Sequence, residues 1–110
     1  MSKIISIAVD AMGGDNSPDK IINGIKIFLE KNKSQKDFIL NVFGKAEEIN
    51  IKLKKYNINS KFIKVIDSQK IVSDEDTPMT AVKNSKNTSM WNCIQHQLEG
   101  KSDISLSAGN

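Results

Sequence analysis

The fold is indicated by a short stretch near the start of the chain, IISIAVDAMGGD at residues 4–15. Its first half is a β-branched apolar run, which predicts a buried strand. The run leads into two glycines, Gly13 and Gly14, flanked by Asp10 and Asp15. In open parallel sheets, ligands bind outside the carboxyl ends of the strands, and glycines there let the backbone approach a ligand closely. The stretch therefore predicts a first strand followed by a candidate binding turn.

This glycine turn differs from the common nucleotide-binding loops. Its spacing does not fit G-x-G-x-x-G, and no Gly-Lys-Ser/Thr follows it. Taken alone, it is more typical of a plain strand-to-helix connection. Its carboxylates also repel anions unless they orient a donor, a metal or the loop itself, so a simple phosphate cradle is disfavoured.

The rest of the chain alternates between strand and helix patterns. Further strands are predicted in FILNVFG at 38–44, in KFIKVID at 61–67 and at the start of DISLSAGN at 103–110. Helices are predicted at 17–32, at 45–56 and at 89–100, with a proline-started segment at 74–86. Strands and helices that alternate at these lengths predict a parallel sheet with helical crossovers.

The helix patterns also predict caps and buried faces. The first helix is expected to take Ser17 as its N-cap, and the last to stop at Gly100. The residues expected to face the core in the first helix are Ile21, Ile22, Ile25, Phe28 and Leu29. Those in the second are Ala46, Ile49, Leu53 and Tyr56, and those in the last are Met90, Ile94 and Leu98.

Composition narrows the classes of function. The net charge is +3, but all 16 basic residues are lysines and none is the arginine that reads bases and phosphates bidentately. The lysines are dispersed, which favours a solvated face over a nucleic-acid surface. Cys93 is the single cysteine, so an internal disulfide framework is excluded. A packed thiol and a solvent-exposed His96 are expected, and no residues have metal-ligand spacing.

A second small-residue turn, SAGN at 107–110, follows the last predicted strand. Its hydroxyl, glycine backbone and amide could contact a polar ligand, at Ser107, Gly109 and Asn110. Two such turns at the same edge of one sheet would wall a single crevice.

A third candidate lies in AVKNSKNTSM at residues 81–90. The ammonium and hydroxyl donors of this stretch could face an anion; they belong to Lys83, Lys86, Thr88 and Ser89. The alternative is a polar connection between helices, with Thr88 or Ser89 as an N-cap.

Three of these stretches together resemble the bacterial phosphate acyltransferases of the PlsX type. IAVDAMGGDNSP, DTPMTAVKNSKNTSM and SAGN occur in the order and approximate spacing of that family. The resemblance covers residues 1–110 as the N-terminal part of a single domain, with the C-terminal remainder absent. It implies a three-layer α/β/α fold with a mainly parallel sheet, similar to the isopropylmalate dehydrogenase and phosphotransacetylase group.

The resemblance also implies a function. The expected reaction is reversible transfer of a fatty acyl group from acyl carrier protein to inorganic phosphate, forming acyl phosphate for phospholipid synthesis. No cofactor, metal or nucleic acid is implied. A homodimer in the cytoplasm, peripheral to the cell membrane, is implied. The residues expected to bind phosphate or the acyl group are Asp10, Gly13, Gly14, Asp15, Lys83, Lys86, Ser89, Ser107, Gly109 and Asn110.

The middle motif departs from the family pattern. Lys83 stands where the family has arginine, and Asn84 and Ser85 carry no charge where basic residues are usual. A truncated or split-gene product without activity of its own therefore remains an alternative. A nicotinamide-dependent dehydrogenase is a weaker one, because the glycine fingerprint is absent.

Overall fold

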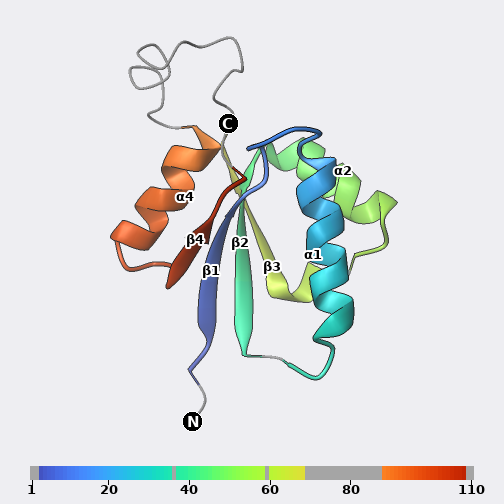
Figure 1. The fold of residues 1–110 in the computed structure, drawn as a ribbon, viewed down its shortest axis with the longest axis horizontal. Helices are drawn as coiled ribbons and strands as arrows, with labels where there is room; N and C mark the ends of the chain where they lie inside the picture. The colour runs from blue at the N-terminus through green and yellow to red at the C-terminus, as the bar shows by residue number, and fades with distance from the viewer. Residues whose placement is uncertain (1–2, 36, 59, 69–87, 109–110) are drawn as a thin grey trace.

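The computed structural model describes residues 3–35, 37–58, 60–68 and 88–108. Strands and helices alternate along the chain (Figure 1). The elements are β1 (Ile5–Asp10), α1 (Asp19–Lys31), β2 (Phe38–Gly44), α2 (Ala46–Lys55), the 3-10 helix η1 (Ser60–Phe62), β3 (Ile63–Asp67), α4 (Ser89–Leu98) and β4 (Ile104–Leu106). They include every predicted strand and three predicted helices. The proline-started segment at 74–86 lies outside the described residues.

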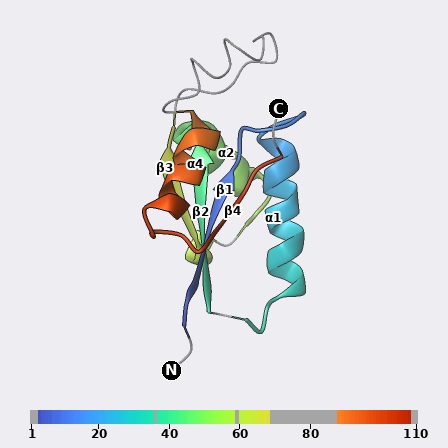
Figure 2. The same cartoon turned by 60° about the vertical axis from the view of Figure 1, so that its left-hand side comes forward.

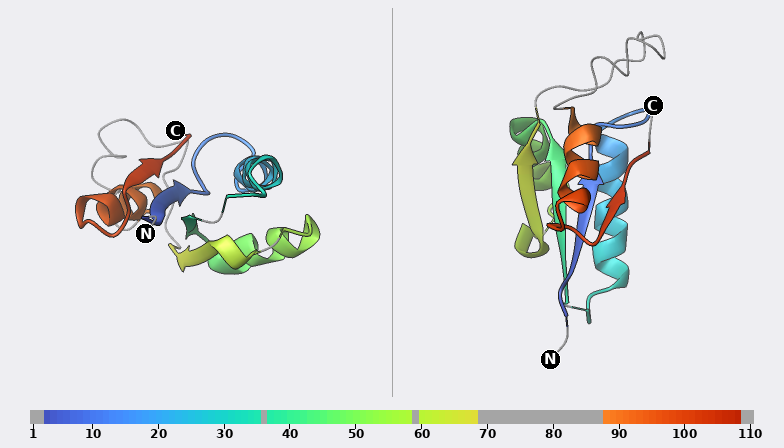
Figure 3. Two further views of the ribbon diagram at one scale, coloured as in Figure 1. Left: turned by 90° about the horizontal axis from the view of Figure 1, so that it is seen from below. Right: turned by 90° about the vertical axis from the view of Figure 1, so that its left-hand side faces the viewer.

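The strands form one parallel sheet in the order β3-β2-β1-β4. In the centre, β1 pairs with β2 from Ile5 opposite Phe38 to Asp10 opposite Phe43. Helices α1 and α2 cover one face of the sheet, and α4 covers the other (Figure 3). The predicted three-layer α/β/α architecture is confirmed.

The strand order changes direction beside β1. From β1 the chain moves outward through β2 and β3, and it then returns to place β4 on the other side of β1. Accordingly, α1 and α4 lie on opposite sides of β1 (Figure 2). In open α/β sheets, such a switch point leaves a crevice outside the carboxyl ends of the two strands, where ligands bind. The topology therefore predicts a binding site at the carboxyl ends of β1 and β4.

The main core lies between the sheet and helices α1 and α2. Ile22 and Ile25 of α1 and Ile49 and Leu53 of α2 are buried there, as their spacing predicts. Phe28 departs from the prediction because it is 38 % exposed. It lies beside a cavity that α1 leaves over the sheet.

Strand β1 is buried only in its second half. Ala8, Val9 and Asp10 are buried, whereas Ile5 is exposed. The amino end of the strand projects past α4 (Figure 1). The prediction of a buried strand therefore holds for the half that leads into the glycine turn.

Helix α4 turns a different face to the sheet from the one its apolar spacing predicts. Ser89 and Cys93 are buried, whereas Ile94 is 44 % and Leu98 is 75 % exposed. The predicted core face, Met90, Ile94 and Leu98, is therefore wrong. The buried residues of α4 are small or polar: Cys93 packs with Ala8 and Phe43 of the sheet, and Ser89 donates to Asp10.

His96 belongs to a polar network beneath α4 and is partly buried rather than solvent-exposed as predicted. Its Nδ1 lies 2.6 Å from Ser102 Oγ, and its ring packs edge-on against Phe43. The amide of Asn41 donates to Ser6 Oγ at 2.7 Å and to Ser102 Oγ at 3.2 Å. Burial lowers the pKa of His96. The network fixes α4 against the sheet with hydrogen bonds where apolar contacts are few.

Ser17 is not the N-cap of α1. The cap position is taken by Pro18, which gives no side-chain cap, and the helix begins at Asp19. The hydroxyl of Ser17 instead donates to the carbonyl oxygens of Gly13 and Gly14. Ser17 thus closes the glycine turn.

Within the described parts of the chain, no helix is both long enough and apolar enough to cross a membrane.

Candidate functional site

The centre of the site is the carboxylate of Asp10, the last residue of β1. This side chain is only 1 % exposed, and three donors surround it. Oδ1 accepts from Ser89 Oγ at 2.6 Å and from the backbone N–H of Met12 at 3.1 Å. Oδ2 accepts from Ser107 Oγ at 2.8 Å. A buried carboxylate needs such partners, because an unpaired buried charge is costly.

These hydrogen bonds join segments that are distant in the sequence. Met12 lies in the glycine turn after β1, Ser89 begins α4, and Ser107 follows β4. Asp10 is separated from Ser89 by 79 positions and from Ser107 by 97. One side chain therefore holds three predicted motif regions together at the switch point of the sheet.

The start of α4 agrees with the alternative reading of the middle motif, in which a polar residue caps the helix. Thr88 is the N-cap, since its Oγ1 accepts from the backbone N–H of Trp91 at 3.1 Å. Ser89 is therefore not the N-cap, and its hydroxyl donates to Asp10 instead. The helix N-terminus, which carries a partial positive charge, begins beside the carboxylate.

The glycine turn packs directly against the segment after β4. Gly14 has a positive φ of 80°, a conformation that favours glycine. A Cβ placed there would lie 2.7 Å from the Cβ of Ala108. The glycine turn thus lies beside Ala108, in the described part of SAGN, and both the φ angle and the close approach favour glycine at position 14.

Two further polar residues, Ser68 and Asn92, lie near the carboxyl end of β3 and were not predicted from the sequence. Ser68 follows β3 and is buried, and its backbone N–H donates to the carbonyl of Gly44 at 2.7 Å. Its hydroxyl accepts from the amide of Asn92 on α4 at 2.8 Å. The position of Ser68 directly after a predicted strand was the signal that could have found it.

The other predicted site residues are placed as follows. Gly13 lies in the turn, where its carbonyl accepts from Ser17, and Asp15 is exposed. Lys83, Lys86, Gly109 and Asn110 lie outside the described residues. Among the residues that the structure describes, no group of histidine, cysteine and acidic side chains could hold a metal ion.

A cavity of about 390 Å³ opens beside Asp10, between α1 and strands β1 and β4. Its walls are mainly apolar, and Asp10 and Ser107 lie at its lining. The site therefore combines an anchored polar cluster with an apolar space.

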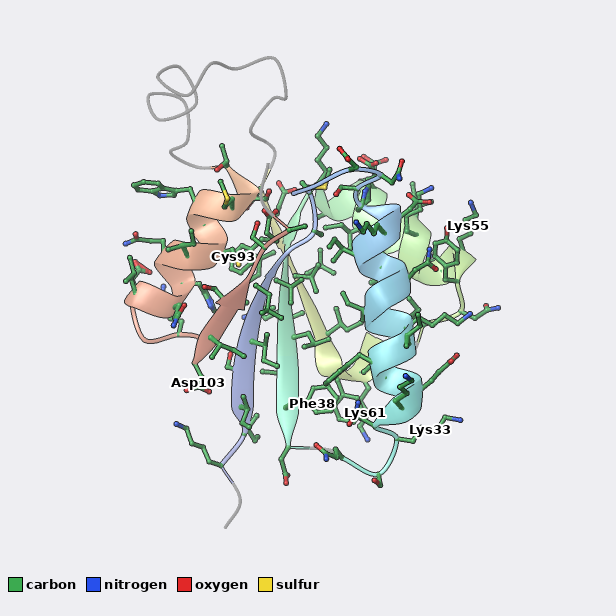
Figure 4. The ribbon with its side chains drawn as sticks, in the orientation of Figure 1. Lys33, Phe38, Lys55, Lys61, Cys93 and Asp103 are labelled. Atoms are coloured by element: carbon green, nitrogen blue, oxygen red, sulfur yellow. The ribbon has the colours of Figure 1, made fainter. Side chains whose placement is uncertain are left out.

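Cys93 lies on the opposite face of the sheet, under α4, and is buried (Figure 4). Burial raises the pKa of its thiol to about 11, and its Sγ lies 3.7 Å from the carbonyl oxygen of Leu106. The expectation of a packed thiol rather than a nucleophile is consistent with this environment.

Comparison of the sequence with protein-family models places the chain in a family. A family model described as "Fatty acid synthesis protein" matches residues 5–110, which is nearly the whole chain. The chain belongs to the fatty acid synthesis protein family. The resemblance drawn from the glycine turn, the middle motif and SAGN is confirmed.

Relatives within this family carry a more specific name. A phosphate acyltransferase of Pelagibacter ubique is 46 % identical over the full 110 residues. Phosphate acyltransferases of Ehrlichia canis and Clostridium acetobutylicum are 36 % and 32 % identical, over 97 % and 94 % of the chain. The chain spans 30 to 32 % of the length of these relatives.

Proposed function

We propose that the intact protein transfers a fatty acyl group from acyl carrier protein to inorganic phosphate. The observation that carries this proposal is the Asp10 carboxylate, which joins the glycine turn, the start of α4 and the end of β4 at the switch point. The names of the relatives supply the reaction class. The acyl phosphate would serve phospholipid synthesis.

The reaction needs little chemistry from side chains. A phosphate oxygen attacks the thioester carbonyl, a carbon–oxygen bond forms, and the carbon–sulfur bond breaks. The carrier's sulfur leaves as thiolate and takes up a proton. Phosphate is already nucleophilic and the thioester is activated, so positioning and stabilisation of the developing oxyanion can supply most of the catalysis. No covalent acyl-enzyme is required.

The hydrogen bonds of Asp10 support a positioning role for this side chain in the proposed reaction. A serine hydroxyl has a single O–H to donate, and those of Ser89 and Ser107 are both directed at Asp10. These serines are therefore positioning residues, and so is Asp10. Donors to the anion would come from backbone N–H groups of the Gly13–Gly14 turn, from the N-terminus of α4 and from Lys83 and Lys86.

The partners follow from the same proposal. Acyl carrier protein supplies the acyl group, and the dispersed lysines favour an acidic partner electrostatically. We propose a homodimer that works in the cytoplasm, peripheral to the cell membrane. Phosphate is the second substrate.

The test measures phosphate-dependent release of the carrier thiol by the intact protein, with hexadecanoyl carrier protein as donor. We expect Asp10→Asn to lower kcat/KM by about 100-fold, because the single oxygen of the amide cannot accept from Met12, Ser89 and Ser107 together, so the three segments lose their common anchor. The matched control is Asp37→Asn, an exposed acid in the loop before β2, which should leave the rate unchanged. Equal rates in the two variants would remove Asp10 from the proposed site. Absence of phosphate-dependent release in the wild type would contradict the proposed function.

A further inference from the structure

We infer, on the basis of the proposed function, that Ser68 and Asn92 form a positioning pair for the reaction. The amide of Asn92 on α4 donates to Ser68 Oγ, at the end of β3, at 2.8 Å. Together with the hydrogen bond from Ser89 to Asp10, this contact sets where the N-terminus of α4 lies. Neither member of the pair touches phosphate. Both act through the helix whose first N–H groups are proposed to bind it.

Helix α4 faces the sheet with a polar stripe. Of the described helices, it alone covers its face of the sheet (Figure 3). The residues of this stripe are spaced three or four apart, so they lie on one side of the helix. They are Ser89, Asn92, Cys93 and His96. Three of the four make hydrogen bonds beneath the helix, to Asp10, Ser68 and Ser102.

The large apolar residues of α4 lie on its other side. Trp91, Ile94 and Leu98 are 40 %, 44 % and 75 % exposed. At about 100° per residue, they lie roughly half a turn around the helix from the polar stripe. Apolar burial against the sheet would favour the opposite rotation. Hydrogen bonds therefore decide which side of α4 meets the sheet, and such a conflict between local pattern and fold is typical of a functional position.

One hydrogen bond at the first residue of α4 would leave the helix able to pivot about that point. Asn92 lies about 4.5 Å further along the axis, and its partner follows β3, whereas Asp10 ends β1. Strands β1 and β3 flank β2, which places them about 10 Å apart. Two anchors on different strands therefore fix the direction of the helix as well as the position of its first residue.

Ser68 is itself held firmly to the sheet. It is only 3 % exposed, and its backbone N–H donates to the carbonyl oxygen of Gly44, the last residue of β2, at 2.7 Å. The preceding residue, Asp67, accepts from the backbone N–H of Ala46 at 3.1 Å and so ties the end of β3 to the start of α2. Because Ser68 is fixed in this way, a shift of α4 would break its hydrogen bond to Asn92.

The position of α4 matters because its proposed role in the reaction depends on geometry. A misplacement of about 1 Å in a group that positions reactants can lower a rate by on the order of 100-fold. Loss of the pair should therefore weaken the use of phosphate, which the helix N-terminus is proposed to bind. Use of the acyl carrier protein should change little.

The test compares Asn92→Ala with Ser102→Ala in the intact protein, with phosphate varied at saturating hexadecanoyl carrier protein. Ser102→Ala is the matched control, because it also removes a hydrogen bond of α4, the one to His96, but about two turns from the helix N-terminus. Asn92→Ala should raise the KM for phosphate by roughly tenfold, the effect of losing one hydrogen bond. Ser102→Ala should leave this KM unchanged, and urea unfolding should show that both variants lose similar stability.

Ser68→Ala removes the same hydrogen bond from the other side and serves as a second test. It should raise the KM for phosphate as much as Asn92→Ala does. The double variant should be no worse than either single variant, because both substitutions remove one shared interaction.

Two results would overturn the inference while the proposed function stands. The first is an equal KM for phosphate in Asn92→Ala and Ser102→Ala. The second is a double variant in which the effects of Ser68→Ala and Asn92→Ala simply add.

A wild-type protein that shows no phosphate-dependent release of the carrier thiol would contradict the proposed function separately. Calorimetric titration with inorganic phosphate then decides the inference. We expect Asn92→Ala to bind phosphate roughly tenfold more weakly than the wild type and Ser102→Ala to bind it equally well. Equal binding by all three proteins, or binding by none of them, would overturn the inference.

Discussion

Replacing Gly14 with alanine tests whether the glycine turn and the segment after β4 are packed as closely as the structure shows. The substitution has two costs. A side chain at a φ of 80° costs about 1–2 kcal/mol. The new Cβ would also lie 2.7 Å from that of Ala108, and the shift that relieves this overlap costs a further 1–3 kcal/mol. The free energy of unfolding should therefore fall by about 2–5 kcal/mol.

The chain offers a matched control for the first of these costs. Gly100, at the end of α4, has a φ of 79° but no described heavy atom within 4 Å of its would-be Cβ. Gly100→Ala should therefore cost only about 1–2 kcal/mol. Urea unfolding of the intact protein measures both values. Adding Ala108→Gly to Gly14→Ala should restore roughly 1–3 kcal/mol, because it removes the overlapping methyl group.

Equal destabilisation by Gly14→Ala and Gly100→Ala, with no rescue by Ala108→Gly, would contradict this close packing. That result would mean that the two turns do not touch. The crevice would then lack one of its walls.

Three further predictions concern single side chains. Burial lowers the pKa of His96, so the folded state favours the neutral ring. The free energy of unfolding should therefore be highest above pH 6.5, the ordinary pKa of histidine, and fall as the pH drops below that value. Denaturant titrations at several pH values should show this loss of stability, and His96→Gln should make the loss smaller. The Cys93 thiol, with a pKa of about 11, should resist alkylation by iodoacetamide at pH 8 until urea unfolds the protein. Mass spectrometry follows the reaction, and rapid alkylation of the folded protein would contradict the burial of this thiol. Asp10→Asn should lower the free energy of unfolding by about 1–3 kcal/mol, because an amide presents one acceptor oxygen where two oxygens now accept. If urea unfolding gives the variant the same stability as the wild type, the three-donor cluster around Asp10 is contradicted.

The strands and crossovers could be predicted from the sequence because their signals are local. Apolar runs end at glycine or polar turns, and the intervening helices carry apolar stripes, as at Ile22 and Ile25 in α1. Helix α4 was predicted correctly in position but not in orientation. Its spacing favours Ile94 and Leu98 as core residues, whereas the helix buries Ser89 and Cys93 instead. Periodicity within one helix holds no information about the polarity of the surface it will meet.

The candidate site was predictable as a set of segments rather than as a set of contacts. Each turn shows itself by its small residues after an apolar strand. The hydrogen bonds of Asp10 to Ser89 and Ser107, however, cross 79 and 97 positions and depend on β4 lying beside β1. The alternation of strands and helices does not determine that order.

The most direct test of the central claim is to give the intact protein hexadecanoyl carrier protein together with ¹⁸O-labelled inorganic phosphate and to analyse the products by mass spectrometry. We expect hexadecanoyl phosphate that carries the label, formed in step with free carrier thiol. Free fatty acid without labelled acyl phosphate, or no release of the carrier thiol, would contradict it.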